Sequence, residues 1–486
     1  MIRFSHRSES RGPGRVVALV ATLLVSLGAA APSADAPRPH IVMILADDLG
    51  WADVGWHGPD IKTPNLDALA SGGAKLEHFY VQPLCSPTRA ALMTGRYPMR
   101  HGLQVGVVRP WASHGLPLDE RTLPSALKQA GYETAICGKW HLGHSRVEYL
   151  PTRRGFDHQY GHYNGAIDYF THERDGGFDW HRDDKVNRDE GYSTDLLANE
   201  AAKLVETHDV SRPLFLYLPF NAVHSPHQVP PRYKEPYAAL PEPRRTYAGM
   251  TAAMDEAIGR VVAALDKKGI RENTLILFSS DNGGPDAGRV SSNGPLHGEK
   301  GTLYDGGVRV PAFANWPGKI KPNTVVDNAL HMVDIYPTLL KLAGAPAEQT
   351  LPIDGRDAWP AISGEKAADR GPILINATPD NGAILADGWK LIVRKNGAAP
   401  ADDEEAPAAK KKAQAKKAAP PAPPATELFH VAADPNETKN LADSEPAKVA
   451  ELRKLYEGFA SQAIPPRNLR AALPGFKVPK VWGEFD

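Results

Sequence analysis

The chain has 486 residues, and its 56 lysine and arginine residues are balanced by 57 aspartate and glutamate residues, which gives a net charge of −1. A near-neutral chain lacks the basic excess of a typical nucleic-acid-binding protein, so we expect no nucleic-acid partner. Hydrophobic residues make up 42% of the chain, and only two cysteines are present. Two cysteines exclude a scaffold built from disulfides, so the fold must be held together by its core.

The first 36 residues have the layout of an export signal. Four arginines within residues 1–15 precede the apolar run VVALVATLLVSL at 16–27, and the segment ends in the sequence ADA. This arrangement is typical of a signal peptide, and about a dozen apolar residues are too few to span a bilayer. We therefore predict a signal peptide over 1–36, no other membrane segment, and an exported protein that is periplasmic, secreted or held at the cell surface.

After this signal, short apolar runs alternate with helical patterns. The apolar runs are continuous, as expected of strands that helices cover on both faces of a parallel sheet. Predicted strands cover residues 40–46, 133–137, 214–219 and 274–280, and predicted helices cover 63–73, 125–131, 193–208 and 246–269. The alternation predicts an α/β fold with a large, mostly parallel sheet sandwiched by helices.

The composition changes abruptly near residue 397. Residues 397–426 are rich in alanine, proline and lysine and contain no large apolar side chain, so we predict that they are disordered. Strand-like segments at 389–395 and 427–435 flank this insert, which places it at the tip of a hairpin. We predict a catalytic domain over 37–365 and a smaller C-terminal α+β subdomain of antiparallel strands and a helix over 366–486.

Each of four predicted strands is followed by side chains suited to catalysis or metal binding. They are Asp47 and Asp48, Lys139 and His141, Asn221 and His224, and Asp281 and Asn282. Any single pair is as typical of a turn or a helix cap, but ligands of open α/β sheets bind at this edge. Carboxylate and amide oxygens suit Ca²⁺ or Mg²⁺ rather than zinc or copper. With the cationic side chains, including Lys300, they favour a site for a tetrahedral oxyanion such as sulfate or phosphate.

The segment PLCSPTRAALMTGRYP at 83–98 places Cys85 in a turn before a helix that ends at Gly95. Arg89 lies four residues after Cys85 and so shares its helical face. Taken alone, Cys85 could equally be a buried thiol or form a disulfide with Cys137. The sequence CSPTR matches the C-x-P-x-R modification motif, and here the chain resembles the formylglycine-dependent sulfatases of the alkaline phosphatase superfamily.

The resemblance extends over nearly all of the chain after the signal. ADDLGWADVGWHG, CSPTR, CGKWHLG, VHSPH, SSDNGG and GEKGTLYDGGVRVP occur in the order found in this family, and ELFHVAADPNETKNLA is similar to its C-terminal subdomain signature. The segments YNGAIDYFTHER and LPFNAVHSPHQVP are most similar to the arylsulfatase B group, the N-acetylgalactosamine-4-sulfatases. The low-complexity insert is not a feature of the family.

The resemblance implies a role for each matching residue. Asp47, Asp48, Asp281 and Asn282, together with modified Cys85, would bind Ca²⁺, or Mg²⁺ in its place; Arg89 would hold the modified residue, Lys139 and Lys300 would bind sulfate oxygens, and His141 and His224 would transfer protons. A formylglycine-generating or anaerobic sulfatase-maturating enzyme would oxidise Cys85 to an aldehyde. The hydrated aldehyde would then attack sulfur, with His224 or Lys300 protonating the leaving oxygen and His141 taking a proton as sulfate departs.

The implied substrate is a sulfated carbohydrate, with the 4-sulfate of N-acetylgalactosamine as the leading prediction. Tyr169 and His172 lie in the loop-rich stretch 160–192 and are predicted to contact the sugar, the alternative being that they pack the loop. Two other functions remain open at this point. A related hydrolase of phosphate or phosphonate monoesters would share the motif, and an inactive relative would bind sulfated glycans without cleaving them.

Overall fold

The computed structural model describes residues 38–365, 369–378, 380–394, 425–467, 472 and 475–485. The predicted signal peptide and residues 397–424 of the predicted insert lie outside these ranges. Residues Arg38–Asp486 form one compact unit. The division between residues 365 and 366 into two domains therefore stays a prediction.

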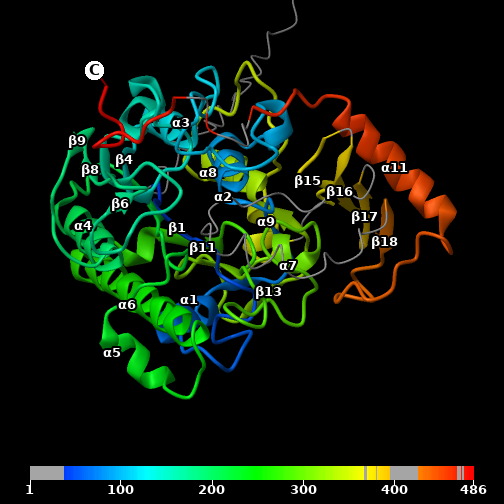
Figure 1. Ribbon diagram of the computed structural model, residues 1–486, viewed down its shortest axis with the longest axis horizontal. Helices are drawn as coiled ribbons and strands as arrows, with labels where there is room; N and C mark the ends of the chain where they lie inside the picture. The colour runs from blue at the N-terminus through cyan, green and yellow to red at the C-terminus, as the bar shows by residue number, and fades with distance from the viewer. Residues whose placement is uncertain are drawn as a thin grey trace, which may run out of the picture. The chain divides into compact units, whose positions relative to one another are not determined.

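Ten strands form the main sheet, and the five at its centre run parallel (Figure 1). In sheet order the central strands are β11 (Thr274–Ser280), β1 (His40–Ala46), β10 (Leu214–Pro219), β4 (Glu133–Lys139) and β5 (His158–His162). The outer strands are β13 (Thr324–Val326), β2 (Ala74–Leu76) and β12 (Ala312–Asn315) beside β11, and β8 (His181–Arg182) and β9 (Lys185–Val186) beside β5. The predicted α/β fold is confirmed, and the antiparallel pairs lie toward the sheet edges.

Helices cover both faces of this sheet. On one face lie α1 (Pro64–Ser71), α4 (Ser193–Thr207) and α6 (Arg244–Lys268), and on the other α2 (Cys85–Thr94), α3 (Leu123–Gln129) and α8 (Met332–Leu342). Along β1, Ile41 and Met43 pack into the core beneath α2, α3 and α8, whereas Val42 and Ile44 pack beneath α1, α4 and α6. Alternate residues of a strand point to opposite faces, so a strand between two cores must be apolar throughout.

The strand register brings the predicted site residues to one edge. Ala46, the last residue of β1, is paired with Ser280, the last residue of β11. Asp47 and Asp281 therefore leave the sheet side by side, and the backbone N–H of Asp281 donates to Ala46 O at 3.0 Å. On the other flank of β1, Leu45 is paired with Pro219 at the end of β10.

The C-terminal part of the chain forms a separate four-stranded antiparallel sheet. Its strands are β15 (Ile373–Ile375), β16 (Asn381–Ala386), β17 (Trp389–Arg394) and β18 (Thr426–Phe429), and α11 (Pro446–Ala460) packs on β16 and β17 (Figure 1). These elements match the predicted antiparallel strands and helix. Residues 395–425 connect the paired strands β17 and β18, as expected of a hairpin. Thr426, predicted as the last residue of the insert, is instead paired with Val393 in the sheet.

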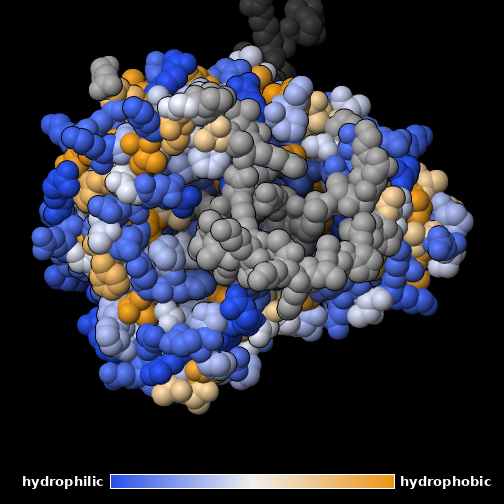
Figure 2. Space-filling model, viewed as in Figure 1, coloured by the Kyte–Doolittle hydropathy of each residue, from blue (hydrophilic) through white to orange (hydrophobic). Residues whose placement is uncertain are grey.

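Shorter elements complete the fold. They are β3 (Phe79–Tyr80), β6 (Glu173–Arg174), β7 (Gly177–Phe178), β14 (Leu330–His331), α5 (Pro231–Lys234), α7 (Asp305–Val308) and α9 (Trp359–Ile362), with 3₁₀ turns at Pro98–Arg100, Val147–Tyr149, Pro151–Arg154, Glu235–Tyr237 and Arg271–Asn273. On the face shown in Figure 2, hydrophilic side chains predominate among the described residues and apolar ones are dispersed between them. Within the described ranges, no helix has both the length and the apolar character needed to cross a membrane.

Candidate active site

Four acidic or amide side chains converge where β1 and β11 end. Asp47 and Asp48 follow β1, Asp281 and Asn282 follow β11, and all four are buried. The backbone N–H of Asp48 donates to Asp281 Oδ1 at 3.3 Å, and Asn282 Nδ2 donates to Asp48 Oδ1 at 2.7 Å. The structure thus brings together the four predicted oxygen donors from two strands far apart in sequence.

Cys85 is fully buried and is the first residue of α2, whereas it was predicted in the turn before this helix. Its Sγ donates to Asp47 Oδ1 at 3.4 Å. Burial, reinforced by Asp281 and Asp47, raises the pKa of the Cys85 thiol well above its usual value. Both cysteines are free thiols, so the alternative disulfide with Cys137 is not formed. An unmodified Cys85 would therefore stay protonated and be a weak nucleophile.

Arg89 lies one turn further along α2 and binds Asp281. Its Nε and Nη2 donate to Asp281 Oδ2 at 3.0 and 2.8 Å, and its Nη1 donates to the carbonyl of Lys139 at 3.1 Å. Burial alone would raise the pKa of Asp281, but Arg89, Lys139 and Lys300 outweigh it and lower that pKa. Asp281 is therefore held as a carboxylate.

Two lysines from separate segments reach the two acids that follow β1. Lys139, at the end of β4, places Nζ 2.6 Å from Asp47 Oδ2, and Lys300, in the loop before α7, places Nζ 2.9 Å from Asp48 Oδ2. Burial and the nearby Asp281 nevertheless raise the pKa of Asp47 to about 6. Lys139 and Lys300 are thus held against the carboxylates of the site. Their positive charges can also stabilise an anionic ester that binds there.

The two predicted proton-transfer histidines, His141 and His224, follow β4 and β10. His224 Nδ1 donates to Ser225 O at 2.6 Å, and its Nε2 is 3.7 Å from Asp48 Oδ2. His141 has a positive φ of 57° and places Nε2 3.1 Å from Val108 O. Both rings are buried, and carbonyl partners fix them, so the second nitrogen of each imidazole has a set direction.

Two supporting residues were missed by the sequence analysis. Ser86 Oγ donates to His141 O at 2.9 Å and accepts from Val108 N at 3.0 Å, which joins α2 to the His141 segment. On α6, Tyr247 places its hydroxyl 2.9 Å from Asp48 O and accepts from Gly50 N at 3.2 Å. Each contact joins segments far apart in the chain, and neither residue belongs to a strand-end pattern that could have revealed it.

The chemistry of this cluster fits a hard divalent cation. Ligand atoms of Asp47, Asp48, Cys85 and His224 all lie within 4.8 Å of one another. Asn282 Oδ1 is buried and accepts no hydrogen bond from any described residue. A buried oxygen without a donor is costly unless a ligand satisfies it. Carboxylate and amide oxygens are the donors that Ca²⁺ prefers.

Tyr169 and His172, predicted to contact the sugar, are both buried. The Tyr169 hydroxyl lies 2.6 Å from Asn221 O and 2.9 Å from His224 O, so it supports the loop that carries His224. His172 stacks on Trp180 with ring centroids 4.4 Å apart. For these two side chains the structure favours the packing alternative over a direct contact with substrate.

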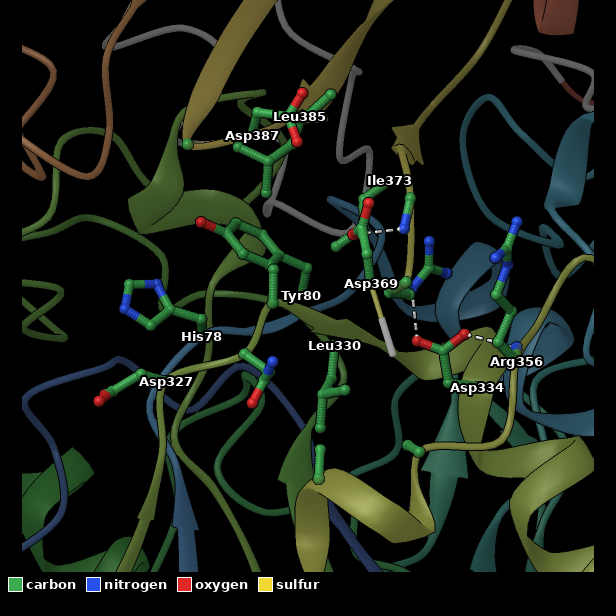
Figure 3. A pocket seen from close by; sticks show the side chains of 18 of the residues that line it. His78, Tyr80, Asp327, Leu330, Asp334, Arg356, Asp369, Ile373, Leu385 and Asp387 are labelled. Atoms are coloured by element: carbon green, nitrogen blue, oxygen red, sulfur yellow. Dashed lines mark hydrogen bonds and ion pairs between the residues drawn. The ribbon is translucent and has the colours of Figure 1, made fainter. Parts of the chain in front are cut away.

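A cavity of about 640 Å³ lies elsewhere, between the start of α8 and the C-terminal sheet (Figure 3). Tyr80, Leu330 and Ile373 surround its centre, and none of the predicted site residues is among its described lining. Asp334, on its wall, is held by Arg370 Nε at 2.6 Å and by a backbone N–H at 2.9 Å. This cavity lacks the convergent reactive groups of the strand-end cluster, to which we therefore assign the active site.

Comparisons with known proteins identify the family to which the chain belongs. The Sulfatase family model matches residues 39–345. Arylsulfatase J of Mus musculus is 39% identical over 90% of this chain and 78% of its own length, and N-acetylgalactosamine-6-sulfatase of Mus musculus is 35% identical over 72% and 70%. The crystal structure of Ps i-CgsB in complex with k-i-k-neocarrahexaose has a TM-score of 0.77 and 31% identity over 88% of this chain and 94% of that one. The chain therefore belongs to the sulfatase family and is a sulfuric ester hydrolase.

Proposed function

We propose that this sulfuric ester hydrolase removes sulfate from a sulfated carbohydrate, with Cys85 oxidised to formylglycine as its nucleophile. The observation that carries the proposal is the position of Cys85, whose Sγ lies against Asp47 in a compact set of metal-ligand atoms bordered by two lysines. Relatives named for a sulfated N-acetylgalactosamine and a similar structure solved with neocarrahexaose support a carbohydrate substrate.

The raised pKa of the Cys85 thiol is the physical reason for a modified nucleophile. A thiol attacks as its thiolate, and burial beside carboxylates disfavours that form. A hydrated aldehyde at the same position offers a hydroxyl instead, next to Asp47 and the other acids. Oxidation of Cys85 by a maturation enzyme would therefore convert an unreactive buried group into a usable one.

The surrounding residues would bind the metal ion, bind the sulfate group and transfer protons. A Ca²⁺ ion held by Asp47, Asp48, Asp281 and Asn282 would supply charge to stabilise a deprotonated hydroxyl and a sulfate oxygen. Lys139 and Lys300 would bind the other sulfate oxygens and neutralise charge that develops as the S–O bond breaks. His224 or Lys300 would protonate the leaving oxygen, and His141 would accept a proton from the nucleophilic residue when sulfate departs. Arg89 would keep Asp281 ionised and in place.

The substrate position that we propose is the 4-sulfate of N-acetylgalactosamine, as the resemblance to the arylsulfatase B group implies. Purified, matured enzyme would be assayed on N-acetylgalactosamine 4-sulfate and 6-sulfate, and on p-nitrophenyl sulfate and p-nitrophenyl phosphate. We expect sulfate esters to be preferred over phosphate and the 4-sulfate over the 6-sulfate. Preference for phosphate would overturn the proposed reaction, and preference for the 6-sulfate would overturn only the proposed position.

The nucleophile is tested by peptide mass spectrometry. Protein co-expressed with a formylglycine-generating enzyme should carry an aldehyde in place of the thiol in the peptide that contains Cys85, whereas Cys137 should remain a thiol. Activity should rise with the modified fraction across preparations. A fully active preparation with an intact Cys85 thiol would contradict the proposed nucleophile.

A further inference from the structure

The loop that carries Lys300 lies against the segment that leads into Cys85. The backbone N–H of Gly301 donates to Pro83 O at 3.0 Å, two residues before Cys85, and that of Lys300 donates to Gly284 O at 3.2 Å. Further along the loop, Gly307 O accepts from Gly283 N at 3.0 Å. On this side, backbone hydrogen bonds hold the loop to the active-site rim.

The other side of the loop is bound by the C-terminal sheet. Lys390, on β17, is fully buried and places Nζ 2.6 Å from Asp305 Oδ1 and 2.7 Å from Glu437 Oε1. The backbone N–H of Asp305 donates to Glu437 Oε2 at 2.7 Å, and the Tyr80 hydroxyl donates to Asp305 Oδ2 at 3.2 Å. Every carboxylate oxygen of Asp305 and Glu437 thus has a partner. We name Asp305, Lys390 and Glu437 the clamp.

A second contact lies beside the clamp. The Tyr304 hydroxyl donates to Glu427 Oε1 at 2.8 Å, and Arg394 forms an ion pair with the same carboxylate. His297, at the start of the loop, stacks on Tyr304 with ring centroids 4.1 Å apart. The contacts with β17 and β18 are therefore made at the Tyr304–Asp305 end of the loop, and His297 at its other end packs on Tyr304.

A buried ion pair is an unusual way to attach a loop. Replacing such a group by apolar residues is often neutral or stabilising, so burial of charge by itself is weak support for stability. Apolar packing also holds the loop, because Leu303 and Val308 share one buried cluster with Ile392 and other residues of the C-terminal sheet. Directional charge-assisted hydrogen bonds can in addition hold the loop in one geometry.

We propose that the clamp positions Lys300 for sulfate binding, so that Asp305, Lys390 and Glu437 are positioning residues for catalysis. None of them reaches the strand-end cluster, and each acts through the loop between Gly298 and Asp305. The inference rests on the proposed role of Lys300 at the sulfate group. The C-terminal sheet would then help to position a residue of the active site, in addition to packing against the rest of the protein.

The test is a double-mutant cycle on p-nitrophenyl sulfate with the full-length, matured enzyme. Lys390→Met and Lys300→Ala are made singly and together, and kcat and KM are measured for each. We expect Lys390→Met to lower kcat/KM by roughly 10- to 100-fold, the size expected when a contacting group is displaced. If the clamp acts through Lys300, Lys390→Met has no further effect in the Lys300→Ala background.

Two variants separate positioning from general loss of stability. Leu391→Ala truncates the neighbouring buried residue of β17, which packs in the core and does not contact the loop; below its melting temperature it should retain wild-type kcat and KM. Lys390→Arg keeps a cation between the two acids and should restore part of the lost kcat/KM. If Lys390→Met is not recovered as folded protein, Glu437→Gln, which preserves side-chain shape, is carried through the same cycle.

Equal losses of kcat/KM in both backgrounds, or an equal loss in Leu391→Ala, would overturn the positioning role. The proposed function is tested separately, by assaying the wild-type enzyme on sulfated sugars, so its failure can be distinguished from failure of the positioning role. A wild type that hydrolyses p-nitrophenyl sulfate but no sulfated sugar would leave the cycle fully interpretable.

Discussion

Two buried clusters of charge are connected by the loop that carries Lys300 and Asp305, and they are built differently. In the active-site cluster, the carboxylates of Asp47, Asp48 and Asp281 face the cations of Arg89, Lys139 and Lys300. In the clamp, one cation, Lys390, lies between two acids, Asp305 and Glu437. Both clusters are removed from solvent, where an unpaired charge costs several kcal/mol.

The clusters differ in how completely their polar atoms are satisfied. Each carboxylate oxygen of the clamp has a donor, whereas Asn282 Oδ1 in the active site has none among the described residues. A cluster in which every polar atom has a hydrogen-bond partner holds its segments in one arrangement. A cluster with an unpartnered oxygen can still bind a ligand. We therefore expect active-site variants to lose mainly activity, and clamp variants to lose both activity and stability.

The largest effect is expected from Cys85→Ala. Loss of the nucleophile should lower kcat/KM by at least about 10⁴-fold. The free energy of unfolding should change little, because the side chains are similar in size. The matched control is Cys137→Ala, a second buried thiol on β4 that packs in the core. Equal activity losses in both variants would show that the site depends on packing at either cysteine and not on a nucleophile at Cys85.

The next largest effects on activity are expected from substitutions of the two buried lysines, Lys300 and Lys390. Lys300→Ala removes a group that would contact the sulfate, and kcat/KM should fall by roughly 10²- to 10³-fold. Lys390→Met acts at a distance and should cost less activity but more stability, seen as a lower midpoint of urea unfolding. Lys128→Ala removes a surface lysine paired with Asp157 and should change neither quantity. If Lys390→Met lost more activity than Lys300→Ala, and Lys300→Ala lost more stability, the proposed difference between the two clusters would be wrong.

The sequence predicts a cluster well when the residues that form it are neighbours in the sequence, and poorly when they are far apart. The apolar strands and the polar residues near their ends are adjacent in sequence, so the sequence predicts β1, β4, β10 and β11 with nearly correct bounds. Strands such as β8 and β12 have only two to four residues, too few for a periodic pattern. The clamp joins Asp305 to Lys390, 85 positions apart, and no local pattern encodes such a pairing.

Burial was the other feature that the sequence did not reveal. Tyr169 and His172 have the residue types of a sugar site, yet tertiary packing turns both inward. Aromatic and histidine side chains serve equally well in cores and in binding sites, so residue type alone cannot decide between them. The resemblance to sulfatases identified residues that lie together in the structure, whereas the contacts of supporting residues such as Ser86 and Tyr247 could be found only from the structure.

Removal of divalent cations should distinguish the clusters without mutation. After treatment with a chelator, the enzyme should lose activity and regain it with Ca²⁺ or Mg²⁺. Ion at 100 times its dissociation constant would add about 3 kcal/mol to the free energy of unfolding. Asp47→Asn should reduce this increment, whereas Glu437→Gln should retain it, since Asp47 belongs to the metal-ligand cluster and Glu437 does not. An unfolding free energy that no divalent cation changes would contradict the metal site.

The smallest expected effect is a pH dependence that belongs to the clamp. Burial, with a smaller contribution from Asp305, raises the pKa of Glu437 to about 7 in spite of Lys390. Between pH 5 and pH 7 the folded protein keeps a proton that the unfolded chain has lost. The free energy of unfolding should therefore decrease as pH rises through this window, by an amount on the order of 2 kcal/mol, and level off above it.

Asp47, whose pKa is raised to about 6, adds a decrease of the same sign, so the wild-type profile by itself cannot assign the effect. Urea unfolding of wild type and Glu437→Gln between pH 5 and pH 8 isolates the clamp, because the variant keeps Asp47 and removes the titrating carboxyl at position 437. The variant should show the shallower decrease. Parallel profiles would mean that Glu437 stays ionised between Lys390 and the Asp305 N–H across this range. In that case Lys390 would lie between two ionised carboxylates at neutral pH, and the clamp would contribute no pH dependence to the free energy of unfolding in this range.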